Sequence, residues 1–204
     1  SYSQISYNKN TRDHTERLLN FINYDIKFDD NIKVRQRNIK KGFKIFIPGD
    51  ISNASFVIVA ALLIPESTII IKKLLYNKTR IEFIRILVKM GANIEIKNIK
   101  LINSEYLCDV KVMHTSNLKN ITIDKRNIIP LIDEIPILSI IATQGKGKTT
   151  IKDAQELRLK ECDRIHAICE NLSKMNADIV EQEDGFIING GKRLYYTTIN
   201  NCFF

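Results

Sequence analysis

The feature that most constrains the fold is a unit that recurs three times along the chain. The stretches LLNFINYDIKF, ILVKMGANIEI and NLSKMNADIVE each join the end of an amphipathic helix to an extended apolar segment. Asn23, Gly91 and Asn176 stand at the junctions, and both residue types tolerate the left-handed backbone that ends a helix. The same helix, stop and strand used three times indicates internal repetition.

Further helices and strands surround these units. Phe83, Leu87 and Met90 form the apolar stripe of one helix. The stretches STIIIKKL, YLCDVKVMHT, KTTIKDA and GFIINGG are typical of strands. Residues 52–63 and 133–143 predict two helices that are buried nearly all round. We therefore expect an α/β (α+β) protein built from repeated β-α-β-α-β-β units.

The punctuation of the chain predicts one boundary. Pro48-Gly49 is the strong break in the first half, so we place a hinge or domain boundary there. With 204 residues, the chain is long enough for one large domain or two small ones.

Composition excludes several classes of protein. The longest apolar run, FVIVAALLIP, is about half the length of a membrane span, and the polar start of the chain does not resemble a signal peptide. The four cysteines form no CxxC pair, so we expect unpaired thiols and a cytoplasmic location. Three scattered histidines complete no ligand cluster, and we expect neither a metal nor a cofactor.

The net charge of +8 admits two interpretations. An Ile-, Lys- and Asn-rich composition leaves many lysines simply solvated, whereas an anionic partner would use them as ligands. Basic residues do not alternate with aromatic ones, so nucleic acid is weakly supported and a small polyanion remains.

The stretch GKGKTT invites comparison with a phosphate-binding P-loop. That motif needs a glycine five positions before Gly147, and Ala142 stands there instead. The residues that follow begin a strand and not the helix that a P-loop opens. We expect a turn between a buried helix and a strand.

Two acidic positions are candidates for chemistry. Asp133 opens an apolar helix, where it caps the helix or accepts a proton from a docked substrate. Glu161 lies where we expect the buried face of the third helix to begin, with Lys160 and Arg164 beside it on the helix surface. The alternative for Glu161 is a simple ion pair with Arg164. Arg12 precedes the first helix and is either solvated or an anion ligand.

Four stretches occur in a telling order: TRDHTERLL, PGDISNASFVIVAA, LIDEIPILSIIA and LRLKECDRI. Together they resemble the 5-enolpyruvylshikimate-3-phosphate (EPSP) synthase family, with mild departures at Asn53 and Cys162, where the family pattern has serine. The resemblance covers nearly the whole chain. It implies a two-domain enolpyruvyl transferase fold, with residues 1–48 ending the N-terminal-side domain and residues 49–204 forming most of the second.

The resemblance also implies a reaction. The enolpyruvyl group of phosphoenolpyruvate passes to the 5-hydroxyl of shikimate 3-phosphate, and phosphate is released. Asp133 would be the base near that hydroxyl and Glu161 the proton-transfer residue near the methylene carbon. Lys160 and Arg12 would bind shikimate 3-phosphate, and Arg164 would bind phosphoenolpyruvate. The enzyme would be a monomer in the cytoplasm, with these two small molecules as its partners.

Family motifs that lie outside these stretches are missing from the sequence, so we expect an internal portion that is inactive alone. Three alternatives stay open. A UDP-N-acetylglucosamine enolpyruvyl transferase shares the fold but would be expected to lack TRDHTE and ELRLKECDR. An anion-binding module would keep the fold without depending on Asp133 or Glu161, and a nucleic-acid binder would show steep salt dependence.

Overall fold

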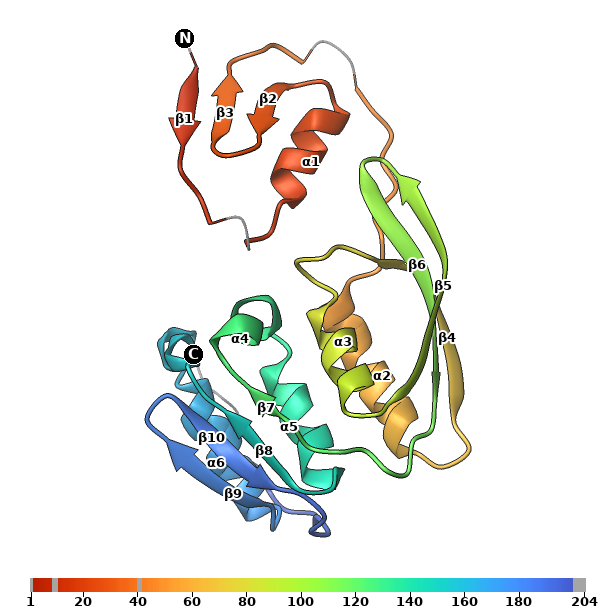
Figure 1. The fold of residues 1–204 in the computed structure, drawn as a ribbon, viewed down its shortest axis with the longest axis vertical. Helices are drawn as coiled ribbons and strands as arrows, with labels where there is room; N and C mark the ends of the chain where they lie inside the picture. Colours follow the sequence, from red (N-terminus) through yellow and green to blue (C-terminus); the bar gives the residue numbers. More distant parts are fainter. Residues whose placement is uncertain (1, 9–10, 40–41, 200–204) are drawn as a thin grey trace.

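A computed structural model of the protein describes residues 2–8, 11–39 and 42–199. Over these residues the chain forms three sheets, with helices packed between and beside them (Figure 1). The elements in chain order are β1 (Ser3–Ile5), α1 (His14–Phe21), β2 (Asp25–Phe28), β3 (Ile32–Arg35), α2 (Ile51–Leu63), β4 (Thr68–Leu75), α3 (Glu82–Lys89), β5 (Asn93–Ile102), β6 (Glu105–Met113), β7 (Thr122–Ile123), α4 (Lys125–Leu131), α5 (Ile135–Gln144), β8 (Lys148–Ile151), the 3-10 helix η1 (Gln155–Leu159), α6 (Arg164–Lys174), β9 (Asp178–Gln182) and β10 (Gly185–Asn189).

The N-terminal sheet is small and antiparallel, in the order β1-β3-β2, with α1 packed beside it. In Figure 1 this sheet lies at one end of the molecule, and His14 and Arg17 of α1 contact Glu105 and Ser104 at the second sheet. Every hydrophobic side chain that is buried among the described residues belongs to the stretch from Ile51 to Ile188. The N-terminal sheet and α1 therefore contribute no buried residue to the core.

The second sheet has the order β4-β6-β5, antiparallel throughout, and is covered by α2 and α3. Asp50 caps α2 by accepting a hydrogen bond from the backbone N–H of Asn53 at 3.1 Å. The expected stripe of α3 is confirmed, since Phe83, Leu87 and Met90 are all at most 1% exposed. This stripe drives α3 against the sheet and fixes the loop that precedes it.

The third sheet has the order β7-β8-β10-β9, and only its β7–β8 pair is parallel. Helices α5 and α6 pack against it, and α5 also packs against α2, which covers the second sheet. Helices α2, α3 and α5 thus lie between the two larger sheets (Figure 1). This arrangement confirms the mixed α/β class and the helices packed inside sheets that the sequence predicts.

The three predicted helix stops are confirmed by their backbone angles. Asn23, Gly91 and Asn176 have φ values of +57°, +89° and +72°, and each ends a helix shortly before a strand. The GKGKTT stretch also behaves as expected, because α5 ends at Gln144 and β8 begins at Lys148.

Other expectations are wrong in part. Helix α2 is not buried all round, because Phe56 and Val57 are 62% and 53% exposed on the side away from the core. Cys108 and Cys169 are free and buried, as expected for unpaired thiols, but Cys162 is disulfide-bonded.

No single helix among the described residues is long and apolar enough to cross a membrane. Helices α4 and α5 meet the length and composition requirement only as a pair, and they are bent by 117° at the break between them.

Candidate active site

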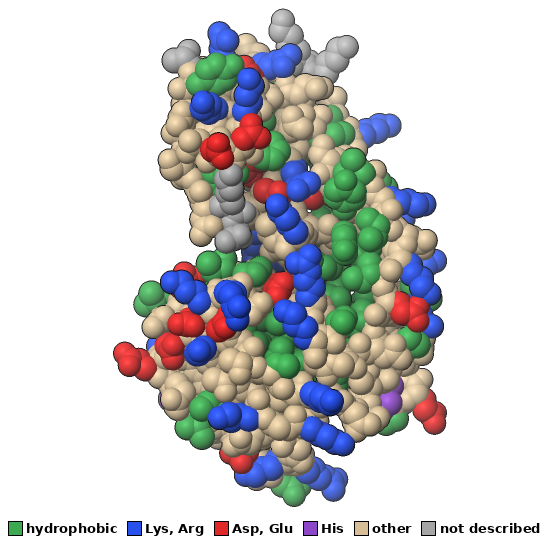
Figure 2. Space-filling model, in the orientation of Figure 1, with side chains coloured by type: hydrophobic (Ala, Val, Ile, Leu, Met, Phe, Trp, Pro, Cys, Tyr) green, Lys and Arg blue, Asp and Glu red, His purple; other side chains and the backbone are tan. Residues whose placement is uncertain are grey.

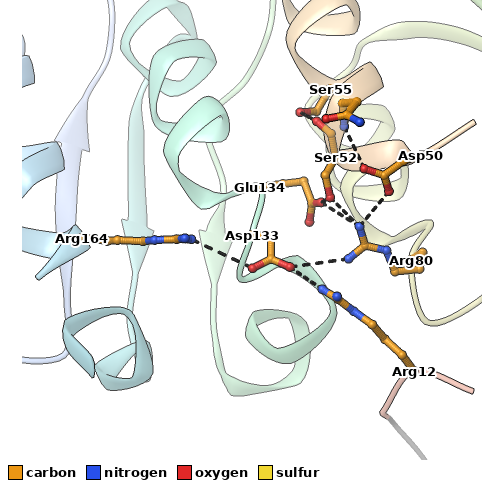
Figure 3. Close-up of polar contacts among 9 residues, drawn as sticks. Arg12, Asp50, Ser52, Ser55, Arg80, Asp133, Glu134 and Arg164 are labelled. Carbon is orange, nitrogen blue, oxygen red and sulfur yellow. Dashed lines mark hydrogen bonds and ion pairs between the residues drawn. The ribbon is translucent and has the colours of Figure 1, made fainter. Parts of the chain in front are cut away.

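The candidate site is centred on Asp133, in the short connection between α4 and α5. Three arginines from three parts of the chain converge on its carboxylate (Figure 3). Oδ2 pairs with Arg12, which precedes α1, and lies 3.7 Å from Nη1 of Arg80, which precedes α3. Oδ1 lies 4.0 Å from Nη1 of Arg164, the first residue of α6.

Opposing effects act on the protonation of Asp133. Burial raises its pKa, but the hydrogen bond from Arg12 and the charges of Arg12, Lys160 and Arg80 outweigh burial and hold the pKa below the ordinary value of 3.8. The carboxylate is therefore ionised at neutral pH. An anion that drew the cations away would make Asp133 a stronger base.

Asp133 does not cap the helix that follows it, contrary to one of the two expectations. Helix α5 begins at Ile135, and the N-cap position is Glu134, whose side chain makes no capping hydrogen bond. Pro136, the second residue of the helix, has no N–H to offer a cap. The carboxylate of Asp133 therefore makes no capping contact with α5, and its oxygens lie near the three arginines instead.

The segment around Glu161 differs from the sequence expectation. Helix α6 does not extend back through Lys160, because Asp163 ends the preceding segment as the N-cap and accepts from the backbone N–H of His166 at 3.0 Å. Lys160 has extended backbone, with ψ of −161°. Lys160 and Arg164 are thus not neighbours on one helix face, although both remain near Asp133.

Glu161 itself is exposed and pairs with Arg164 across the start of α6. The guanidinium donates to Oε1 from Nε at 2.9 Å and from Nη2 at 2.6 Å. A bond from the backbone N–H of Glu161 and this pair with Arg164 hold the pKa of Glu161 below its ordinary 4.5. The structure therefore contains the ion pair that was the alternative interpretation of this motif, with one of its members also facing Asp133.

Two cavities meet at Asp133. One, of about 570 Å³, is lined by Thr11, Arg12, Thr79 and Lys160 together with Asp133. The other, of about 430 Å³, is lined by Glu161 and Arg164 at its polar end and by apolar residues of α5 and α6 beyond. Figure 2 shows the surface hollowed between the N-terminal sheet and the third sheet with its helices, and Lys and Arg side chains lie along the hollow. Each of the five residues singled out in the sequence thus lines at least one of these two cavities, and Asp133 lines both.

Sequence reasoning missed a buried polar group behind Asp133. Arg80 is 6% exposed and contacts Glu134, Asp50 and Ser52 as well as Asp133. Ser52, which accepts from Arg80, in turn donates to Oε1 of Glu134 at 2.5 Å. The available signal was the polar run NKTR between a strand with a buried end and an amphipathic helix, where an arginine needs a partner once it is buried.

Over residues 2–8, 11–39 and 42–199, no group of three or more His, Cys, Asp or Glu side chains is placed to hold a metal ion. The charged groups of the site instead suit an anionic organic ligand, because arginine and lysine bind phosphate and carboxylate oxygens.

Comparison with solved structures defines the class first. The fold is that of the enolpyruvyl transferases: the enzyme NikO from Streptomyces tendae superposes with a TM-score of 0.65 at 14% identity, over 93% of this chain and 43% of that one. EPSP synthase from Acinetobacter baumannii superposes with a TM-score of 0.86 at 34% identity, over 93% of this chain and 43% of that one.

Sequence comparison gives the family. The sequence model of the family EPSP synthase (3-phosphoshikimate 1-carboxyvinyltransferase) matches residues 4–202, and the chain belongs to this family. The 3-phosphoshikimate 1-carboxyvinyltransferase of Petrotoga mobilis is 49% identical over 94% of this chain, and that of Oceanobacillus iheyensis is 42% identical over 90%. The chain spans 45% and 43% of the length of these two relatives.

Proposed function

We propose that this chain supplies one face of the active site of a 3-phosphoshikimate 1-carboxyvinyltransferase. The enzyme would transfer the enolpyruvyl group of phosphoenolpyruvate to the 5-hydroxyl of shikimate 3-phosphate and release phosphate. The observation that carries the proposal is the ionised carboxylate of Asp133, held among Arg12, Arg80 and Arg164 where two cavities meet.

Asp133 has the properties that the base needs. In the addition step the 5-hydroxyl loses a proton while its oxygen forms a bond to the second carbon of phosphoenolpyruvate, and the methylene carbon gains a proton. We assign the first proton to Asp133, which is a charged acceptor at neutral pH. Substrate anions that compete for Arg12 would strengthen it as a base when the hydroxyl arrives.

Glu161 is assigned to the proton transfer at the methylene carbon. It lies beside Arg164, whose guanidinium we assign to phosphoenolpyruvate. Binding of that anion to Arg164 would loosen the pair with Glu161 and bring its pKa up, which an acid requires. In the elimination step the methyl carbon returns a proton as the C–O bond to phosphate breaks, so the same residue acts in both directions.

Lys160 and Arg12 are assigned to shikimate 3-phosphate. Both line the 570 Å³ cavity with Asp133, and Thr11 and Thr79 add hydroxyl groups to its wall. A lysine and an arginine neutralise a phosphate dianion, and Arg12 is half-exposed and able to exchange Asp133 for the ligand.

We also propose a boundary between two domains at Pro48-Gly49, with residues 1–48 ending one domain and residues 49–204 forming most of the other. Two facts support it: the buried hydrophobic residues of the described part of the chain begin at Ile51, and in Figure 1 residues 42–48 run as extended chain into the start of α2. The enzyme would work as a cytoplasmic monomer on these two small-molecule partners.

Calorimetric titration of the 204-residue chain with shikimate 3-phosphate tests this function by binding. Lys160→Ala should weaken binding by about ten- to a hundredfold, because one charge-assisted hydrogen bond contributes about 1.5–3 kcal/mol. Lys174→Ala, at the far end of α6 and paired with Glu170, is the matched control and should bind as the wild type does.

Two results would contradict the assignment. One is equal binding by Lys160→Ala and wild type. The other is tighter binding of a UDP-sugar than of shikimate 3-phosphate, which would favour the related UDP-N-acetylglucosamine transferase.

A further inference from the structure

Arg80 is a buried cation in contact with acidic groups of two different helix starts. Its Nη2 lies 3.2 Å from Oδ1 of Asp50 and 3.5 Å from Oε1 of Glu134, and it also donates to Ser52. Its Nη1 lies 3.7 Å from Oδ2 of Asp133. A single planar guanidinium therefore links the start of α2 to the connection between α4 and α5 (Figure 3).

The groups that hold Arg80 are themselves fixed. Asp50 caps α2, and the backbone N–H of Arg80 donates to the carbonyl oxygen of Asn77 at 2.9 Å. The side chain of Asn77 in turn accepts from the backbone N–H of Thr79 at 2.9 Å, and Asn77, Thr79 and Arg80 are all buried. Arg80 is consequently held in a hydrogen-bonded, largely buried turn directly before α3.

Glu134 is the partner of Arg80 that lies next to the candidate base, Asp133, in the chain. It is 1% exposed, accepts from Ser52 at 2.5 Å, and precedes the first residue of α5. Because Asp133 and Glu134 are adjacent in the chain, a guanidinium that contacts both side chains fixes the backbone between them. Burial disfavours a carboxylate that has no cationic partner, so the contact between Arg80 and Glu134 has a physical reason to persist.

Arg80 differs from the other two arginines around Asp133 in its access to ligand. The side chains of Arg12 and Arg164 are 51% and 23% exposed, whereas that of Arg80 is 6% exposed. An anionic ligand in the cavities therefore has less access to Arg80 than to Arg12 or Arg164.

We infer that Arg80 is a positioning residue of the active site, which acts through Glu134 to hold the Asp133 carboxylate at the meeting point of the two cavities. Its consequence for catalysis rests on the function proposed above. Arg80 does not bind substrate in this account; it keeps the base in place while the substrate phosphate and carboxylate rearrange the exposed cations.

The test compares Arg80→Met, Arg80→Lys and the control Arg85→Met in the 204-residue chain. Arg85 lies in the same helix region, is half-exposed and pairs with Glu82 at 3.6 Å. For each variant, carbon-13 NMR follows the titration of the Asp133 carboxyl group, calorimetry gives the affinity for shikimate 3-phosphate, and thermal unfolding shows that the protein is folded at the temperature used.

Arg80→Met should raise the titration midpoint of Asp133 and weaken shikimate 3-phosphate binding by about tenfold or more. Arg80→Lys should give a smaller change in the same direction, because an ammonium group keeps the charge but cannot span both sets of partners. Arg85→Met should leave both readouts at their wild-type values.

A purely structural role would lower the unfolding temperature of Arg80→Met and leave the Asp133 midpoint and the affinity unchanged, and that result would overturn the inference. If Arg80→Met does not fold, Arg80→Lys decides, and wild-type behaviour in both readouts would overturn it. If the wild-type chain does not bind shikimate 3-phosphate, the proposed function fails for this chain, while the Asp133 titration still judges the role of Arg80.

Discussion

The pKa values of the neighbouring residues Asp133 and Glu134 are shifted in opposite directions. Both are affected first by burial, which raises the pKa of each. At Asp133 the arginines prevail and the pKa is lowered; at Glu134, which is 1% exposed, burial prevails over Ser52 and Arg80 and the pKa is raised above 4.5. Two carboxyl groups that are adjacent in the chain therefore have pKa values displaced in opposite directions.

This contrast predicts a pH-dependent effect of Glu134→Gln on stability. Because the pKa of Glu134 is higher in the folded protein, its contribution to stability is complete below about pH 4.5 and is lost as the pH rises through the folded value. The glutamine does not titrate, so the difference in free energy of unfolding should move in favour of the variant between pH 4 and pH 7.

Urea unfolding of wild type and Glu134→Gln at several pH values measures this difference. Glu183→Gln, at an exposed position, controls for the general removal of a negative charge. A difference that moved in favour of the wild type as the pH rose would show that the Arg80 contact dominates burial at Glu134.

At the scale of the elements, helix ends decide how each unit is laid out. Gly91 stops α3 with φ of +89°, and an added Cβ would meet only the carbonyl oxygen of Asn117, at 3.9 Å. Space therefore does not restrict this position, but backbone conformation does. Asn176 adopts the same left-handed conformation, with φ of +72°, although asparagine has a Cβ atom.

Gly91→Ala should lower the free energy of unfolding by about 1–2 kcal/mol, because left-handed backbone strains a residue with a Cβ. Asn176→Gly relieves that strain but loses the hydrogen bond from Nδ2 to the carbonyl oxygen of Arg193, so it should change stability less than Gly91→Ala does. Gly42→Ala, with open space around it, is the control. Chemical denaturation measures all three. A Gly91→Ala protein as stable as wild type would mean that the stop is set by tertiary packing instead.

The sequence predicts these stops because they depend on local backbone preference. It also predicts the apolar stripe of α3 and the strands that follow each stop. It does not predict the start of α6, where the side chain of Asp163 competes with continuation of the helix through Lys160. Nor does it predict the contacts of Arg80, because these join residues 50, 80 and 134, whose proximity arises only when α2 packs against α5.

At the scale of the molecule, polar contacts attach α1 to the second sheet. Nδ1 of His14 lies 2.6 Å from Oε1 of Glu105, and Arg17 donates to the carbonyl oxygen of Ser104 at 3.1 Å. Asn77 donates to Asp13 at 2.7 Å. Since no residue of α1 is buried, these contacts, and not a shared core, position Arg12 over Asp133.

Glu105→Ala should therefore loosen α1. Loss of the His14 contact should speed amide hydrogen exchange in residues 14–21 by about five- to tenfold, equivalent to about 1–1.4 kcal/mol. Glu95→Ala, on the exposed part of the same sheet and paired with Lys97, should leave that exchange unchanged. Unaltered exchange in Glu105→Ala would show that other contacts hold the N-terminal sheet.

The central claim is that Arg12, Asp133, Lys160, Glu161 and Arg164 form one substrate site although they come from separate parts of the chain. A crystal structure of the 204-residue chain with shikimate 3-phosphate, at a concentration well above its measured dissociation constant, tests this most directly. We expect the phosphate against Arg12 and Lys160 and the 5-hydroxyl within hydrogen-bond distance of Asp133. Ligand bound at another surface, with the cavities around Asp133 empty, would contradict the account.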